Sequence, residues 1–383
     1  MAGGAATGES SGWLGLAALG IATLALLCGI AAVFIAYQGT VASDFLSFWA
    51  AGRLALQGHA ADAYDIVRHH AVEAQAVAGV GLLPFPYPPF ALALFVPFGM
   101  LPFWAAFAAW IAVTAALYLV ATRRCVEPRF ALAQAAAAAN FITGQNGFLT
   151  SGIFIGGTTL IARRPLLAGA ILGLLALKPQ LAVLLPVALI AGREWRAIAG
   201  GILSSVALVA IGFLLFGAGG YSAFLALLPH FSGWLGAGRW PWGELASTFA
   251  LLRWFGVPET AALVVHGAVA LAAAALTARA WALKLDERVP ILAAATLLVP
   301  PYLFTYDALL LTLPLAALLR HRRRQWVVPA IWLLTLLPAI AYLRPFPNTI
   351  AVAAMLTLWA LHAERRESDT DVQPMPLRAV TRG

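Results

Sequence analysis

Charged residues are scarce in this sequence. Only 10% of its 383 residues are Asp, Glu, Lys or Arg, whereas 62% are hydrophobic and the mean hydropathy is +0.86. Such a composition excludes one soluble domain and is typical of a chain that crosses a membrane repeatedly. We therefore expect an all-α, polytopic integral membrane protein.

Cysteines and ligand clusters are also few. Cys28 lies in the first apolar run and Cys125 in a basic loop, so neither a disulfide nor a zinc site is expected. No cluster of carboxylates or histidines has metal-ligand spacing, and no glycine-rich phosphate loop is present. We expect neither a cofactor nor a metal. The net charge of +8 comes from short basic clusters between apolar runs, which is typical of loops beside anionic lipid and excludes nucleic acid as a partner.

The apolar segments number about twelve. Several are shorter than the ~20 residues of a full span, so we expect them to end within the membrane thickness and to line a cavity. The segments are 12–36, 88–122, 129–142, 147–162, 165–177, 180–192, 197–217, 258–281, 289–301, 304–319, 326–343 and 347–362. The first is expected to be an uncleaved span, and 88–122 to cross once, with Pro97 and Pro102 kinking it or leaving its first half at the interface.

Basic residues predict the orientation. They fall in alternate connections, which the positive-inside rule places in the cytoplasm, and the polar motifs then face outward. We predict one transmembrane domain over residues 1–363, with outer loops 37–87 and 218–257 and a disordered cytoplasmic tail over 364–383. The basic connections contain Arg123-Arg124 with Arg129, Arg163-Arg164, Arg193 with Arg196, Arg279 with Lys284 and Arg288, Arg320 to Arg324, and Arg365-Arg366.

Asp44 follows the first span directly. The residues after it, including Phe45, Phe48 and Trp49, recur as in an interfacial helix at the membrane surface. An acid is therefore expected at the mouth of the membrane domain. The alternative is a helix N-cap formed by Ser43 or Asp44.

Lys178 is one of two lysines and lies between two short apolar segments. A buried ammonium is costly unless it snorkels to the interface or meets an anion, and in a cavity open to lipid that anion would be a lipid phosphate. The other outer motifs each have a structural alternative. These are turns for Tyr87-Pro88-Pro89 and Gly144-Gln145-Asn146, interfacial anchors for Trp240 and Trp242, and a helix cap for Tyr306-Asp307.

The order of several motifs resembles glycosyltransferase family 87, over residues 40–200 and again at 300–307. The motifs are the Asp-Phe segment at Asp44, the Gly58 to Asp65 element, Tyr-Pro-Pro, Gly-Gln-Asn, the arginines followed by Leu-Ala-Gly, and the Leu-Lys-Pro step at Lys178. The resemblance implies a GT-C type of fold and transfer of a hexose, mannose foremost, from a polyprenyl phosphate sugar. The acceptor would be a lipid or glycan on the outer face of a bacterial inner membrane. A histidine that such enzymes often carry near Tyr306-Asp307 is absent.

By this resemblance Asp44 is the catalytic base, and transfer from a sugar phosphate also needs a cation near the departing phosphate. We expect substrate contacts from Lys178, Arg53, Tyr87, Gln145, Asn146, Gln180, Tyr306, Asp307 and Arg344. The partners would be the donor, the acceptor and membrane lipids.

Two other classes of function compete with an enzyme. A transporter or lipid flippase would explain the broken helices, but we see no internal repeat, and the polar motifs gather on one face instead of the midplane. A purely structural membrane protein would leave the long first outer loop without a reason.

Overall fold

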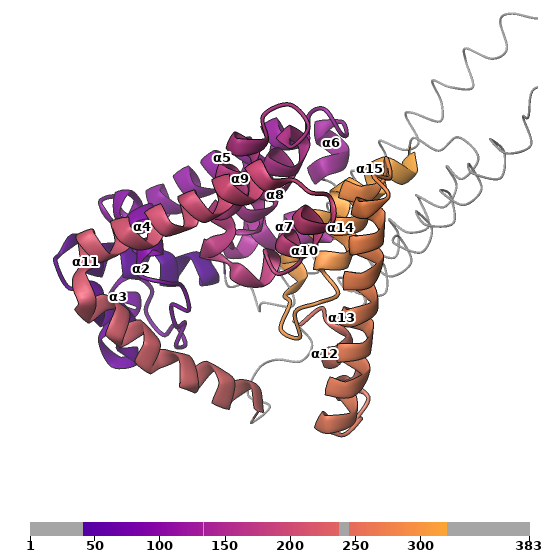
Figure 1. The fold of residues 1–383 in the computed structure, drawn as a ribbon. Helices are drawn as coiled ribbons and strands as arrows, with labels where there is room; N and C mark the ends of the chain where they lie inside the picture. The colour runs from indigo at the N-terminus through magenta and orange to yellow at the C-terminus, as the bar shows by residue number, and fades with distance from the viewer. Residues whose placement is uncertain (1–40, 133, 237–244, 320–383) are drawn as a thin grey trace, which may run out of the picture.

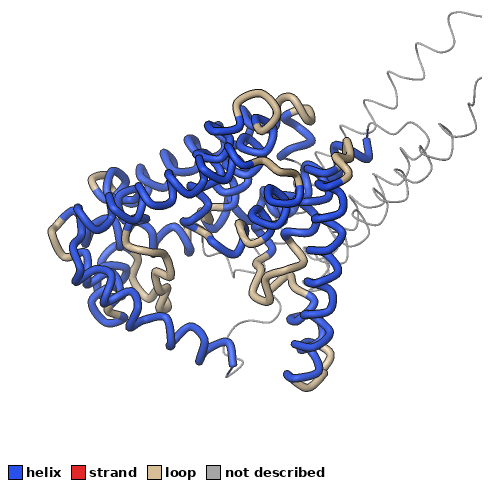
Figure 2. Tube along the Cα trace, viewed as in Figure 1, coloured by secondary structure: helices blue, strands red, loops and turns tan. Residues whose placement is uncertain are grey.

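The computed structural model describes residues 41–132, 134–236 and 245–319, which form helices joined by turns (Figures 1 and 2). Within these ranges the only strand-like feature is an isolated bridge between Leu245 and Phe304. The all-helical prediction is therefore confirmed for the described residues. The predicted segments 12–36, 326–343 and 347–362 and the tail from residue 364 lie outside them.

Most of the helices coincide with apolar segments read from the sequence, whereas those within residues 43–76 and 248–254 lie in the predicted outer loops. The first half contains α2 (Ser43–Leu56), η1 (Ala60–Tyr64), α3 (Ile66–Ala76), α4 (Phe90–Gly99), α5 (Phe103–Thr122), α6 (Pro128–Leu132), α7 (Ala135–Thr143), α8 (Gly147–Leu160), α9 (Pro165–Gly173), η2 (Leu174–Leu177), η3 (Pro179–Leu181) and α10 (Leu184–Ala191). The second half contains α11 (Trp195–Gly236), α12 (Thr248–Trp254), α13 (Glu259–Ala282), α14 (Arg288–Thr296), η5 (Thr305–Leu311) and α15 (Thr312–Leu319).

Three of these helices are long and apolar enough to cross a membrane: α5, residues 195–230 of α11, and α13. Within the predicted single crossing over 88–122, only α5 is long enough to span a membrane. The first part of this segment forms a separate helix, α4, that packs against α2. Apolar side chains such as Leu203, Leu214 and Leu271 are exposed on α11 and α13, as lipid-facing residues would be. The total of about twelve spans and the GT-C arrangement stay predictions.

Local sequence explains where several helices begin and end. The Asp65 side chain accepts hydrogen bonds from the backbone N–H groups of Val67 and Arg68, at 2.9 and 3.0 Å, and so caps α3. Gly144 ends α7 in the left-handed conformation, with φ of 73°, which glycine adopts at low cost. The chain can therefore turn sharply between α7 and α8.

The helix after Asp44 is buried in the protein instead of lying on a surface. In α2, Phe45, Phe48 and Trp49 are buried, and the ring centroids of Phe48 and Phe95 of α4 are 4.7 Å apart. The backbones of α2 and α4 approach so closely that a Cβ at Gly52 would overlap the Phe95 carbonyl. The prediction of a helix is confirmed, while its hydrophobic face packs on protein.

The predicted outer loop 218–257 is largely helical where the structure describes it. Residues up to 236 belong to α11, which bends at Gly217, where φ is 66° and ψ is 179°. Tyr221 beyond the bend donates a hydrogen bond from its hydroxyl to the Val209 carbonyl, at 2.9 Å. The part of the loop containing Trp240 and Trp242 lies outside the described residues.

Candidate active site at the tips of short helices

Lys178 lies between two helical arms that are both too short to cross a bilayer. The arm before it runs from Pro165 to Leu177, and the arm after it from Pro179 to Ala191. Its backbone, with φ of −137° and ψ of 72°, interrupts the helical path. Each arm is about 20 Å long, so Lys178 forms the tip of a helical hairpin.

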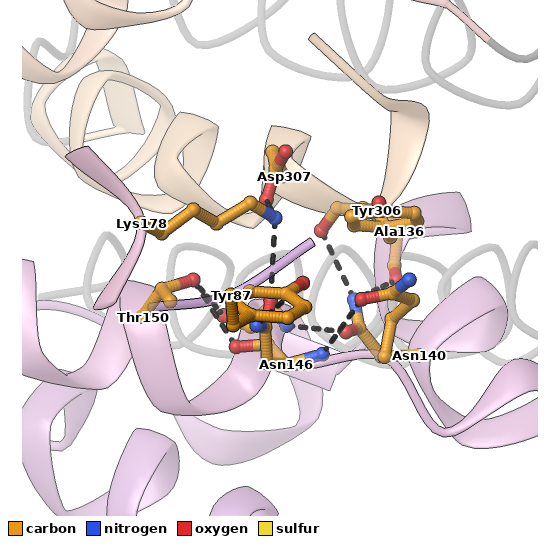
Figure 3. Close-up of polar contacts among 10 residues, drawn as sticks. Tyr87, Ala136, Asn140, Asn146, Thr150, Lys178, Tyr306 and Asp307 are labelled. Carbon is orange, nitrogen blue, oxygen red and sulfur yellow. Dashed lines mark hydrogen bonds and ion pairs between the residues drawn. The ribbon is translucent and has the colours of Figure 1, made fainter. Parts of the chain in front are cut away.

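The ammonium of Lys178 is fully engaged inside the protein (Figure 3). Its Nζ lies 2.5 Å from Oδ1 of Asp307, 3.2 Å from Oδ1 of Asn146 and 4.6 Å from the ring centroid of Tyr306. The side chains of Lys178 and Asp307 are only 2% and 1% exposed. The snorkelling alternative for Lys178 is therefore wrong, because the charge is neutralised by an internal carboxylate instead of reaching the interface.

Two further hairpins bring their tips to the same place. Asn146 lies in the turn between α7 and α8, and Asp307 lies in η5, after the turn that follows α14. Both α7 and α8 pack against η5. The cap alternative for Tyr306-Asp307 does not hold, since the N-cap of η5 is Phe304, without a side-chain cap, and the Asp307 carboxylate faces Lys178.

Tyr87 joins this group from the loop before α4. Its hydroxyl accepts a hydrogen bond from Nδ2 of Asn146 at 2.9 Å, and its backbone carbonyl accepts one from the Tyr64 hydroxyl at 3.0 Å. Burial raises the pKa of the Tyr87 phenol well above its ordinary value, so the hydroxyl stays protonated. We call Tyr87, Asn146, Lys178, Tyr306 and Asp307 the polar cluster.

Asn140 is a residue that the sequence analysis missed. Its Nδ2 donates to the carbonyls of Ala136 (2.7 Å) and Tyr306 (3.0 Å), and its Oδ1 accepts from the Gly147 N–H (2.8 Å). It is completely buried and ties α7, α8 and η5 together beside the polar cluster (Figure 3). An amide after the alanine run 135–139 was a usable signal, because a lone polar side chain in an apolar helix needs partners.

Asp44 lies at the start of α2, beside the turn between α7 and α8 that carries Asn146 of the polar cluster. The N-cap of α2 is Ala42, with φ of 64° and no side-chain cap, so the capping alternative for Asp44 does not hold. The N–H of Ala42 donates to the Ile142 carbonyl of α7 at 2.7 Å, which fixes the start of α2 beside the turn after α7.

The environment of Asp44 suits a proton acceptor. Burial raises the pKa of its carboxyl to about 6, while hydrogen bonds with the Thr143 and Gln145 side chains and the charge of Lys178 act in the opposite direction. A carboxyl with a pKa near neutrality is ionised at pH 7 and still basic enough to take a proton from a hydroxyl. The turn residue Gln145 therefore lies beside the predicted base.

Three of the predicted site residues are not part of this group. Arg53 lies nine residues after Asp44 on α2, about 13 Å along the helix, and its guanidinium contacts the Gly99 carbonyl (3.3 Å) and the Trp49 ring (5.4 Å). Gln180 is half-buried in η3 and makes no side-chain hydrogen bond within the described ranges. Arg344 lies outside the described residues.

Basic residues lie at the other ends of the same short helices. Asn146 precedes α8 and Arg163 follows it, and α8 has 14 residues, which separates the two by about 20 Å. In the hairpin of Lys178, Arg164 precedes α9 and Arg193 follows α10. The polar motifs and the basic connections are thus at opposite ends, as the sequence pattern predicted.

The sequence profile of glycosyltransferase family 87 matches residues 85–301, more than half of the chain. The chain belongs to this family. The match confirms the predicted resemblance and includes Tyr87, Asn146 and Lys178, whereas Asp44 and Asp307 lie outside the matched residues. No curated protein and no solved structure matches this glycosyltransferase. Family membership together with the apolar helices identifies a membrane glycosyltransferase, an enzyme that takes a sugar donor and an acceptor.

Proposed function

We propose that this glycosyltransferase transfers a hexose, mannose foremost, from a polyprenyl phosphate sugar to a lipid or glycan acceptor at the outer face of a cell membrane. The observation that carries the proposal is one acid, Asp44, within electrostatic reach of a buried ammonium, Lys178, among helices too short to span. A polyprenyl chain stays in the bilayer, so its phosphate can reach residues at this depth. A soluble nucleotide sugar carries no lipid chain that would hold its phosphate at this depth.

Each charged residue has one role in the proposed transfer. The acceptor hydroxyl oxygen attacks the anomeric carbon, and the bond from that carbon to the phosphate oxygen breaks with its electrons going to the phosphate. Asp44 takes the hydroxyl proton, and Lys178 stabilises the charge that grows on the departing phosphate. Asn146 positions the Lys178 ammonium through a hydrogen bond, and the Tyr87 hydroxyl positions the Asn146 amide in the same way.

A donor panel tests the proposal. Purified protein is incubated with polyprenyl phosphate sugars and, in parallel, with nucleotide sugars, and released polyprenyl phosphate is measured. We expect release from a polyprenyl phosphate hexose, with mannose the best sugar, and no turnover of nucleotide sugars. Turnover of nucleotide sugars alone would contradict the proposed donor class. Translocation of the intact lipid-linked sugar without release would favour a transporter.

The proposed orientation has its own test. Gly81 in the first loop and Arg163 after α8 are both exposed, and a Cβ at Gly81 would meet no neighbour. In a background without Cys28 and Cys125, we expect Gly81→Cys to react with an impermeant thiol reagent on intact cells and Arg163→Cys to react only after permeabilisation. The reverse pattern would contradict the outer location of the site.

A further inference from the structure

The polar cluster contains the cation that the proposed function needs, but that cation is already occupied. A lysine ammonium has three N–H groups. Around Nζ of Lys178 stand three partners, namely Oδ1 of Asp307 (2.5 Å), Oδ1 of Asn146 (3.2 Å) and the ring of Tyr306 (4.6 Å). A phosphate can therefore contact this ammonium only after one partner has left.

Asp307 is the partner held least completely. The amide of Asn146 is also bonded to the Tyr87 hydroxyl, and the backbone of Tyr306 is bonded to Asn140. In contrast, apart from Lys178 the Asp307 carboxylate has only a minor hydrogen bond with the Phe304 backbone, and its buried Oδ2 has no well-formed partner in the part of the chain that the structure describes. A buried carboxylate with one oxygen lacking a well-formed partner is incompletely satisfied. Of the three partners it is also the only anion, so it is the one whose place a phosphate can take while still neutralising Lys178.

The net charge of the site also indicates that Asp307 is the partner that leaves Lys178. With Asp44 ionised, as its role of base requires, Asp44, Asp307 and Lys178 carry a net charge of about −1. A sugar phosphodiester brings one more negative charge, so it gains no net attraction while Asp307 neutralises Lys178. Binding becomes favourable when Lys178 exchanges its ion pair with Asp307 for one with the phosphate.

We propose that Asp307 is a displaceable counter-ion, which occupies the place of the donor phosphate on Lys178 until the donor arrives. This inference rests on the proposed function and assigns Asp307 a role distinct from substrate binding. Asp307 keeps Lys178 charged within the protein, and it competes with every incoming anion. The apparent affinity for the donor is then the intrinsic affinity reduced by the fraction of molecules in which the ion pair is open.

Removing the competing charge tests the inference. Binding of polyprenyl phosphate to the full-length protein is measured in nanodiscs of zwitterionic lipid at about pH 7, where Asp44 is ionised. We expect Asp307→Asn to bind about tenfold more tightly than wild type, as for an ion pair open in about one molecule in ten. In a Lys178→Ala background, Asp307→Asn should have no such effect. Equal or weaker binding by a folded Asp307→Asn protein would overturn the proposal.

A second measurement keeps Asp307 in place and covers the case in which Asp307→Asn does not fold. The chain has only two lysines, Lys178 and Lys284. With Lys284→Arg and isotope-labelled lysine, the single ε-carbon NMR resonance reports on Lys178. We expect it to shift on addition of polyprenyl phosphate and to stay in place on addition of polyprenol. An unmoved resonance at saturating polyprenyl phosphate would show that the pair stays closed and would overturn the proposal.

The two levels of inference fail in different ways. If wild type releases polyprenyl phosphate from the donor while Asp307→Asn binds no more tightly, the counter-ion role fails and the proposed function stands. If wild type neither binds nor releases polyprenyl phosphate, the proposed donor class fails.

Discussion

The two largest hydrophobic cores in the described part of the chain differ in character, and the candidate site lies between them. The core around α2 and α4 is aromatic, with the rings of Phe45, Phe48 and Phe95 each in contact with Trp110. The core around α7 to α10, α13 and α14 consists mainly of alanine and leucine. Large rings lock one helix in one position, whereas small side chains let several short helices bring their tips together.

The two cores contribute different chemistry to the site. The aromatic core positions Asp44 and Tyr87, which supply the acid and a hydroxyl. The alanine-leucine core positions the hairpins that carry Asn146, Lys178 and Asp307. We infer that the aromatic core holds the base, and that the helix tips supported by the alanine-leucine core form the phosphate site. The predictions below test this division.

The largest effect is expected at Asp44. Asp44→Asn preserves the size of the side chain and removes its ability to take a proton, so turnover should fall about 10²- to 10⁴-fold. Protein yield should stay close to wild type, and donor affinity should not fall, because the variant removes a negative charge from the site. Turnover is measured as polyprenyl phosphate released per enzyme. If Asp44→Asn keeps full activity, Asp44 is structural, and Asp307 and Glu244 become the next acids to test.

A smaller effect, on stability and donor binding, is expected at Lys178 in the alanine-leucine part of the site. Lys178→Ala leaves the buried Asp307 carboxylate unpaired, which should destabilise the protein by about 3–5 kcal/mol and weaken donor binding by about 30-fold or more. The double variant Lys178→Met/Asp307→Leu removes both charges at similar volume, so it should recover thermal stability without recovering donor binding. Wild-type donor affinity in this double variant would show that Lys178 has only a structural role.

The packing of the alanine-leucine side predicts a third, still smaller effect. At Gly169 of α9 a Cβ would overlap the Ala197 carbonyl of α11, whereas at Gly156 of α8 it would meet only the Ala121 Cβ, at 3.8 Å. Gly169→Ala should therefore destabilise the protein by about 1–3 kcal/mol, and the matched Gly156→Ala should be neutral or stabilising by up to about 1 kcal/mol. Melting temperatures in detergent measure both, and equal values would contradict the close approach.

Most of the fold and part of the site were predictable from the sequence. Apolar periods and breaks located the short helices correctly, because the residues at their ends, such as Gly144 and Pro165, act locally. The polar motifs with Tyr87, Asn146 and Lys178 were also recognised from the sequence, since polar residues between short apolar segments are costly without a function.

Long-range contacts explain what the sequence left open. The cap alternative for Asp44 fails because the Ile142 carbonyl, a hundred residues away, holds Ala42 in the left-handed conformation at the N-cap. Lys178 meets Asp307 across 129 residues. Asn140 was missed because two of its three partners, Tyr306 and Gly147, come from other elements. Such pairings depend on how hairpins converge, which no local pattern specifies.

The pH dependence of kcat/KM tests the central claim, that Asp44 is the base, most directly. Burial raises the pKa of its carboxyl from 3.8 to about 6, so the carboxyl is protonated below about pH 6 and then cannot accept the hydroxyl proton. With a polyprenyl phosphate sugar, whose phosphodiester does not titrate in this range, kcat/KM should be level above pH 7 and fall about tenfold per pH unit below 6. The residual activity of Asp44→Asn should lack this limb. A wild-type profile that stays level down to pH 4.5, or an Asp44→Asn profile with the same limb, would contradict the account.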